Sequence, residues 1–268
     1  MEQSQVETDK NYKAWRQVAH AYLENGDNEK ALKYYHRLLE ETKEKNDILS
    51  QSHIYNSIGY VYLRRKDYET SLKFREKALS LRQALKNAQY IAESYNDIGV
   101  IHFTMKHFDK ALEKYKKGLS ILKEDGTSSW HGILFNNLAT VSYHLKNFID
   151  SEHYFQKAFS IFESLQEPQQ IAEISYNLGV IAFSKGEHEN ATGQFKHSLE
   201  WFNSLHDKKM IPTCEKWIGD IYFHKKMFRE ATQYYRKCVK YFGKSDILKY
   251  NDIHHKMEHI QNVMKNLT

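Results

Sequence analysis

A small residue recurs every 40 positions along this chain, each time inside a similar apolar stretch. The stretches include SIGYVYL, DIGVIHF and WIGDIYF, and their small residues are Ala19, Gly59, Gly99, Ala139, Gly179 and Gly219. Twelve positions later each unit has a second small residue, at Ala31, Ser71, Ala111, Ser151, Ala191 and Ala231. Self-similarity at a fixed period of this size predicts a repeat protein in which each unit contacts only its neighbours.

The spacing of apolar residues inside a unit is helical. Tyr55, Ile58, Gly59 and Tyr62 fall on one face of a helix, and short polar breaks such as ENGDNEK separate successive helical stretches. With 2 Pro and 11 Gly, the chain has little of the punctuation that strands and hairpins need. Each unit is therefore expected to be a helix, a turn and a helix.

Large residues of the second helix are expected to pack beside the small residues of the first. An aromatic occupies the same place in five units, at Tyr35, Tyr115, Phe155, Phe195 and Tyr235. The second unit departs from this pattern, because its aromatic, Phe74, is one place early.

These residues resemble the tetratricopeptide repeat pattern, which the first unit meets with Trp15, Val18, Ala19, Tyr22, Ala31 and Tyr35. The resemblance implies an all-α, right-handed solenoid of six 40-residue helix-turn-helix repeats over residues 12–251. The units are 12–51, 52–91, 92–131, 132–171, 172–211 and 212–251. The usual period of the family is 34 residues. The six additional residues are expected at the end of each second helix, which would make these outer helices longer.

The two ends of the repeat array differ. Residues 252–268 are expected to form a capping helix, whose apolar stripe is Ile253, Met257, Ile260, Met264 and Leu267. Residues 1–11 are polar, and no cap precedes the first repeat. That open end is compatible with a removed upstream effector domain, with an oligomer contact such as a homodimer, or with a face polar enough to meet water.

Composition excludes several classes of protein. The net charge of +5 comes from 39 basic and 34 acidic side chains that are interspersed, so nucleic acid is not expected as a partner. No apolar run approaches the roughly 18 residues of a membrane span, and no signal peptide is apparent, so no membrane partner and a cytoplasmic protein are expected. Cys214 and Cys238 are expected to be core thiols.

The sequence shows no catalytic motif. It has no glycine-rich phosphate loop and no nucleophile elbow. Histidine pairs such as His102 with His107 lack the spacing and the nearby carboxylate of a zinc site. We therefore expect a protein that is not an enzyme and has no metal and no cofactor.

In tetratricopeptide repeat proteins the first helices line the concave surface, and the resemblance places the candidate binding residues there. Repeats two to five all present asparagine, at Asn56, Asn96, Asn136, Asn137 and Asn177. The remaining candidates are Tyr60, Arg64, Phe103, Thr140, Tyr143, His144, Tyr176 and Trp217. An asparagine amide both donates and accepts, so a row of them could hold a peptide backbone whatever its side chains. Related repeats could equally have inherited asparagine without using it.

These features predict a non-catalytic module that holds an extended peptide or a partner-protein segment in its groove. The period and the asparagines are similar to the sensor domains of the Rap, PlcR and NprR group of bacterial peptide-pheromone regulators, which implies quorum-sensing signalling. The effector parts of those proteins would not fit in the eleven residues before Tyr12. The alternative is a scaffold for protein assembly or self-association through its outer surface or its open first repeat. An acidic tail is not expected as ligand, because Glu93 and Asp97 would repel it.

Overall fold

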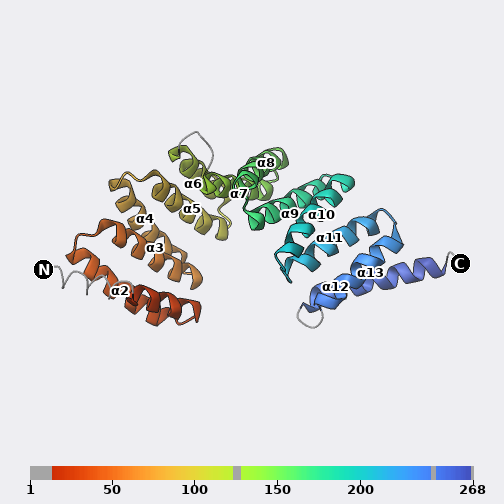
Figure 1. Ribbon diagram of the computed structural model, residues 1–268, viewed down its shortest axis with the longest axis horizontal. Helices are drawn as coiled ribbons and strands as arrows, with labels where there is room; N and C mark the ends of the chain where they lie inside the picture. Colours follow the sequence, from red (N-terminus) through yellow and green to blue (C-terminus); the bar gives the residue numbers. More distant parts are fainter. Residues whose placement is uncertain (1–13, 123–127, 243–245, 267–268) are drawn as a thin grey trace. The chain divides into compact units, whose positions relative to one another are not determined.

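The computed structural model describes residues 14–122, 128–242 and 246–266, and these residues form helices and short turns without a strand. The predicted all-α repeat architecture is confirmed (Figure 1). The chain divides into two compact units, residues 1–145 and 146–268. The predicted polar segment 1–11 lies outside the described residues.

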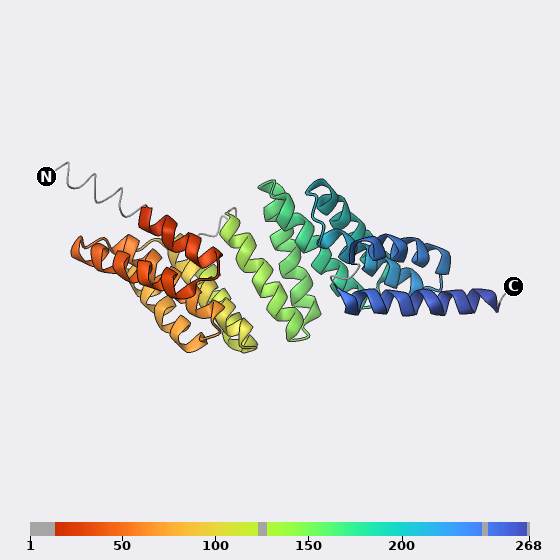
Figure 2. The same cartoon turned by 90° about the horizontal axis from the view of Figure 1, so that it is seen from below.

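Unit 1 contains a helix over residues 14–24 and six more, which are α2 (Asn28–Glu44), α3 (Ile48–Arg64), α4 (Tyr68–Ala84), α5 (Ala88–Thr104), α6 (Phe108–Ile121) and α7 (Ser129–His144). Unit 2 contains α8 (Phe148–Ser164), α9 (Pro168–Ser184), α10 (His188–Ser204), α11 (Met210–His224), α12 (Phe228–Phe242) and α13 (Ile247–Lys265). Within each unit the first helices of the repeats form one layer and the second helices form another (Figures 1 and 2). The exposed side of the layer formed by the first helices, which include α3, α5 and α7 in unit 1 and α9 and α11 in unit 2, is called the first-helix face.

The turns between helices share one geometry. A residue with positive φ recurs at 20-residue intervals, at Gly26, Asn46, Lys66, Lys86, Lys106, Lys146, Gln166, Gly186, His206 and Lys226. Several helices then begin with an Asp or Asn cap, as at Asp47, whose carboxylate accepts from the Ser50 N–H. The repeated reversal after every helix is what stacks the helices side by side.

The length of the repeat is divided equally between its two helices. The first helix α3 and the second helix α4 each have 17 residues. The expectation that only the second helices carry the additional residues is therefore wrong. α3 begins at Ile48, four residues before the predicted start of its unit at residue 52, so the first helices are extended too.

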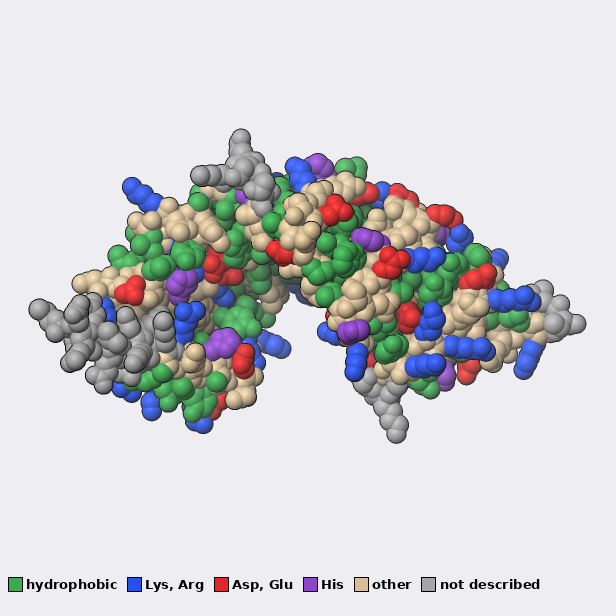
Figure 3. All heavy atoms as spheres, viewed as in Figure 1, with side chains coloured by type: hydrophobic (Ala, Val, Ile, Leu, Met, Phe, Trp, Pro, Cys, Tyr) green, Lys and Arg blue, Asp and Glu red, His purple; other side chains and the backbone are tan. Residues whose placement is uncertain are grey.

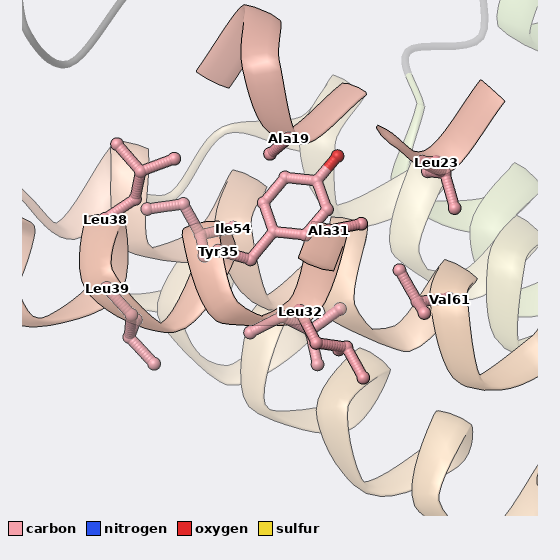
Figure 4. Close-up of a cluster of buried hydrophobic side chains, with 10 residues drawn as sticks. Ala19, Leu23, Ala31, Leu32, Tyr35, Leu38, Leu39, Ile54 and Val61 are labelled. Atoms are coloured by element: carbon pink, nitrogen blue, oxygen red, sulfur yellow. The ribbon is translucent and has the colours of Figure 1, made fainter. Parts of the chain in front are cut away.

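The core rests on small residues packed against large ones. A Cβ added to Gly99 would lie 2.4 Å from Tyr115, and one added to Gly219 would lie 2.8 Å from Tyr235. Figure 4 shows the same arrangement in the first repeat, where the ring of Tyr35 lies beside Ala19 and Ala31. A larger side chain at these places would separate the two helices of a repeat.

The final helix, α13, continues the register of the first helices. It begins at Ile247, five residues before the predicted start and within one residue of the place that the 40-residue period gives. Ile253 and Ile260 of the predicted stripe are buried and Met264 is 38% exposed, while Leu267 lies outside the described residues. The burial of Ile253 and Ile260 agrees with the predicted capping role. The 40-residue period, however, continues through α13, one helix further than expected.

The face of α13 that corresponds to the core-facing side of α3 is polar. In α3 the face toward the second helix carries Tyr55, Ile58, Gly59 and Tyr62. The corresponding residues of α13 are His255, Glu258, His259 and Asn262. A second helix would bury these groups without apolar contacts, so the helix can face water instead.

A ring of four charges joins α13 to α11. Lys216 lies 2.7 Å from Asp220 and 2.9 Å from Asp252, and Lys256 lies 2.8 Å from Asp220 and 3.1 Å from Asp252. The Tyr235 hydroxyl donates to Asp220 at 2.7 Å. Burial alone would raise the pKa of Asp252, but the two lysines lower it below its ordinary value. The ring therefore stabilises the charged form of the aspartate.

Two further expectations can be compared with the structure. Cys214 and Cys238 are both buried free thiols, as predicted. Among the described residues no helix is long and apolar enough to cross a membrane.

The glycine contacts yield a stability prediction. Gly99→Ala should lower the free energy of unfolding by about 1 to 3 kcal/mol, because its methyl group would overlap the Tyr115 ring. Gly193→Ala is the matched control, since nothing lies within 4 Å of its added Cβ, and it should raise stability by about 0.5 to 1 kcal/mol. Urea unfolding followed by circular dichroism would measure both. Equal effects would contradict the packing argument.

The charge ring yields a second prediction. The Asp220 side chain is 11% exposed and holds two lysines and Tyr235, so Asp220→Ala should cost about 3 kcal/mol. Asp252 is 44% exposed, and Asp252→Ala should cost less than about 1 kcal/mol. Because the pKa of Asp252 is lowered by folding, its contribution should be present at neutral pH and lost as the pH falls through the acid range. Urea titrations at pH 7 and pH 3 would test this.

Candidate functional site

The predicted binding residues lie on first helices of both units. In unit 1 they are Asn56, Tyr60 and Arg64 of α3, Asn96 and Phe103 of α5, and Asn136, Asn137, Thr140, Tyr143 and His144 of α7. In unit 2 they are Tyr176 and Asn177 of α9 and Trp217 of α11.

Two asparagines are joined between α5 and α7, and a third, Asn136, directly precedes one of them on α7. The amide of Asn137 donates to Oδ1 of Asn96 at 2.7 Å, and Asn96 is 8% exposed. Oδ1 of Asn136 is buried and has no hydrogen-bond partner among the described residues. A buried polar atom without a partner is costly in a folded protein. This cluster therefore has hydrogen-bonding capacity that the fold leaves unused.

Asn56 has a different environment. Its Oδ1 accepts from Arg75, and its amide donates to Glu93 at 3.4 Å. Both ends of the side chain are thus engaged inside the protein. Asn56 supports the packing of α3 against α4 and α5, and the row of available asparagines begins at α5.

Arg75 and Arg82 are two buried cations that sequence reasoning missed. Arg75 is 5% exposed and packs 3.1 Å from the place of a Cβ on Gly59, where other repeats have Tyr or Phe. Arg82 is fully buried, at the place that phenylalanine occupies in later repeats as Phe162, Phe202 and Phe242. The sequence did contain a signal for Arg75. The aromatic of the second repeat, Phe74, is one place early, so position 75 is occupied by an arginine where other repeats have a ring.

The two arginines are neutralised by two carboxylates of α5. Arg75 pairs with Asp97 at 2.5 Å and Arg82 pairs with Glu93 at 3.1 Å. Arg82 also donates to the Tyr90 carbonyl at 3.1 Å and to Ser94 Oγ at 2.9 Å. Burial raises the pKa of the Glu93 carboxyl, and Arg82 offsets part of that rise. Asp97 and Glu93, the acidic residues noted in the sequence, are therefore held in place by Arg75 and Arg82.

Aromatic residues gather at the ends of α5 and α7. The ring of His144 stacks on Phe108 with centroids 5.1 Å apart and meets Phe103 edge-on at 5.2 Å. Tyr143 contacts His144 at 5.8 Å. The structure thus brings Phe103, Tyr143 and His144 together at the C-terminal ends of α5 and α7.

The other predicted residues of unit 1 have more local roles. Arg64 donates to the carbonyl of Leu23 and so joins α3 to the helix over residues 14–24. Thr140 donates to the Asn136 carbonyl of its own helix at 2.9 Å. Tyr60 is 44% exposed.

In unit 2 two predicted residues bind each other. The indole N–H of Trp217 donates to the Tyr176 hydroxyl at 2.8 Å, and the indole stacks on Phe195 at 5.5 Å. These rings contribute to the packing of α9, α10 and α11. Asn177 is partly buried.

The surface carries charges of both signs. Figure 3 shows Lys and Arg interspersed with Asp and Glu over the visible face of each unit. No three His, Cys, Asp or Glu side chains of the described residues are placed to hold a metal ion.

Solved structures with a similar fold include BtubC (BKLC) from P. vanneervenii, at 20% identity, 87% coverage of this chain, 90% of that chain and a TM-score of 0.69. The apo form of RapI has 16% identity, 96% and 99% coverage and a TM-score of 0.69. A Rap protein complexed with competence and sporulation factor has 14% identity, 96% and 76% coverage and a TM-score of 0.65. The predicted similarity to Rap proteins is confirmed for the fold.

A search of curated proteins found no match. Family models described as tetratricopeptide repeat match residues 14–49, 50–124, 131–204 and 217–244. These matches cover most of the chain, and the chain belongs to the tetratricopeptide repeat family.

Proposed function

We propose that the first-helix face of unit 1 binds an extended peptide, or an extended segment of a partner protein, at the asparagines of α5 and α7. The observation that carries this proposal is the buried Oδ1 of Asn136, which has no hydrogen-bond partner among the described residues. The neighbouring Asn96 Oδ1 is already occupied by Asn137. An incoming backbone N–H is the simplest group that would satisfy Asn136.

The chemistry of the cluster suits a peptide backbone. An asparagine amide can accept from a peptide N–H and donate to a peptide carbonyl at the same time. A buried acceptor without a partner costs about 1 to 3 kcal/mol, which a ligand would recover on binding. Phe103 and His144, at the ends of the same helices, offer an apolar surface for a ligand side chain. Asn177 in unit 2 offers a comparable amide.

Within this class we favour a bacterial signalling peptide acting on a cytoplasmic, non-catalytic sensor. Membership of the tetratricopeptide repeat family supports a binding module. The fold is similar to that of RapI and of a Rap protein complexed with competence and sporulation factor. The peptide itself would be found by selecting a displayed library of random decapeptides on the purified protein.

Two single variants test the assignment of roles. Asn136→Ala should weaken binding of a selected peptide about tenfold, which is about 1.4 kcal/mol, because one hydrogen bond is lost. It should leave the melting temperature unchanged or slightly higher, because a buried unpaired acceptor is removed. Fluorescence anisotropy and thermal unfolding would provide the two measurements.

Asn56→Ala is the matched control on the neighbouring first helix. It should lower stability, because Arg75 loses a buried partner, and it should change peptide affinity less than Asn136→Ala does. Unchanged affinity in the combined Asn96→Ala and Asn136→Ala variant would refute the proposal. In that case the scaffold alternative would be favoured, and light scattering would measure self-association.

A further inference from the structure

A stacked pair of aromatic rings recurs inside the repeats, one ring from each helix. The pairs are Tyr22 with Tyr34, Tyr62 with Phe74, and Tyr222 with Tyr234, with centroids 5.6, 5.6 and 5.7 Å apart. In each pair the two rings belong to the same repeat, and they pack against each other between its first and second helices. The second ring lies on a second helix, at a place that follows the 40-residue period.

Repeat five is the one repeat in which neither place holds a ring, because they are occupied by Ala182 and Gln194. The structure has a cavity of about 280 Å³ at this point, between α8 and α10. It is lined by Gln156, Phe159, Ser160, Leu178, Asn190 and Gln194, together with Glu152 at its rim. The cavity opens on the second helices and is separate from the first-helix face.

Leu178, on the floor of the cavity, is less well covered than the corresponding residues of most other repeats. Leu178 is partly exposed, whereas the residues at the same place in repeats two, three, four and six are buried, at Ile58, Ile98, Leu138 and Ile218. Val18 of the first repeat is also partly exposed. Repeat three has Lys114 at the second place but keeps the imidazole ring of His102 at the first, and repeat four has Ser142 at the first place but keeps Tyr154 at the second. Leu178 is thus uncovered in the repeat that lacks both rings.

The second repeat shows where such a ring lies. Phe74 approaches His36 of the preceding second helix, with centroids 6.5 Å apart. His36 and Phe74 correspond to Gln156 and Gln194, which both line the cavity. A ring bound between these two glutamines would thus take the place of the ring that the repeat lacks.

We propose that this cavity between α8 and α10 binds the side chain of a tyrosine from a partner protein. A cavity of about 150 Å³ holds a benzene molecule, so 280 Å³ is enough for a phenol ring. Leu178 and Phe159 supply the apolar floor and wall, and the amides of Gln156 and Gln194 can hydrogen-bond the phenol hydroxyl.

The charge of the cavity also fits a neutral phenol. Its one charged lining residue, Glu152, is paired with Lys185 at 3.0 Å. A lysine or glutamate of a partner would find no unpaired charge of opposite sign among the residues that line the cavity, and it would lose its hydration on entry. A phenylalanine would leave the glutamine amides without the hydroxyl that they can bind.

The probe for this site is p-cresol, the analogue of a tyrosine side chain, titrated into the ¹⁵N-labelled full chain. Saturable shifts are expected at Gln156, Leu178 and Gln194, with a dissociation constant on the order of 1 mM, as befits a small ligand. Gln194→Tyr should fill the cavity from within, reduce p-cresol affinity at least tenfold and raise the melting temperature.

Glu200→Tyr is the control, because it adds the same ring to an exposed place on α10 outside the cavity. It should leave p-cresol binding unchanged. The proposal is overturned if p-cresol does not bind the parent protein in a saturable way, or if Gln194→Tyr binds it as well as the parent does. Toluene should bind more weakly than p-cresol, and equal affinity would refute recognition of the hydroxyl.

Discussion

The close approach of the two helices of each repeat is the contact on which the structure depends. It requires a residue without bulk on the first helix, such as Gly99 or Gly219, and a large side chain on the second, such as Tyr115, Tyr235 or Arg75. Since every repeat buries little apolar surface alone, this contact must be made again in each repeat for the stack to hold. The shared turn geometry, with a positive-φ residue every 20 positions, keeps the contact in register.

The proposed sites lie where the repeats depart from that pattern. In repeat two Arg75 and Arg82 replace rings and are buried, and their partners Asn56, Glu93 and Asp97 are partly buried. Burying ion pairs seldom adds stability over apolar packing, so these residues are better explained by what they position than by what they stabilise. The neighbouring asparagines of α5 and α7 keep hydrogen-bonding capacity, and the proposed peptide site lies there. In repeat five, which lacks both rings, a cavity lies between α8 and α10.

The ends of an array need a different solution, because a terminal repeat has a neighbour on one side only. Here α13 keeps the register of a first helix but carries polar residues where a second helix would pack. Four charged side chains attach α13 to α11. The lysine precedes the aspartate on α11, as Lys216 and Asp220, and follows it on α13, as Asp252 and Lys256, so each lysine contacts both aspartates. Apolar burial of Ile253 and Ile260 supplies the rest.

The sequence by itself determined the helical class, the 40-residue period, the pairing of small residues with rings and the final cap, because these follow from local spacing and residue size. It also placed the candidate residues on the first helices. Only the tertiary structure decided which of them remain available, since that depends on neighbours distant along the chain. Asn56 is occupied by Arg75 and Glu93, Trp217 binds Tyr176, and Asn136 retains an unpaired oxygen. Period and composition cannot reveal such partners, because a hydrogen bond is set by the distance between two atoms and not by their spacing in sequence.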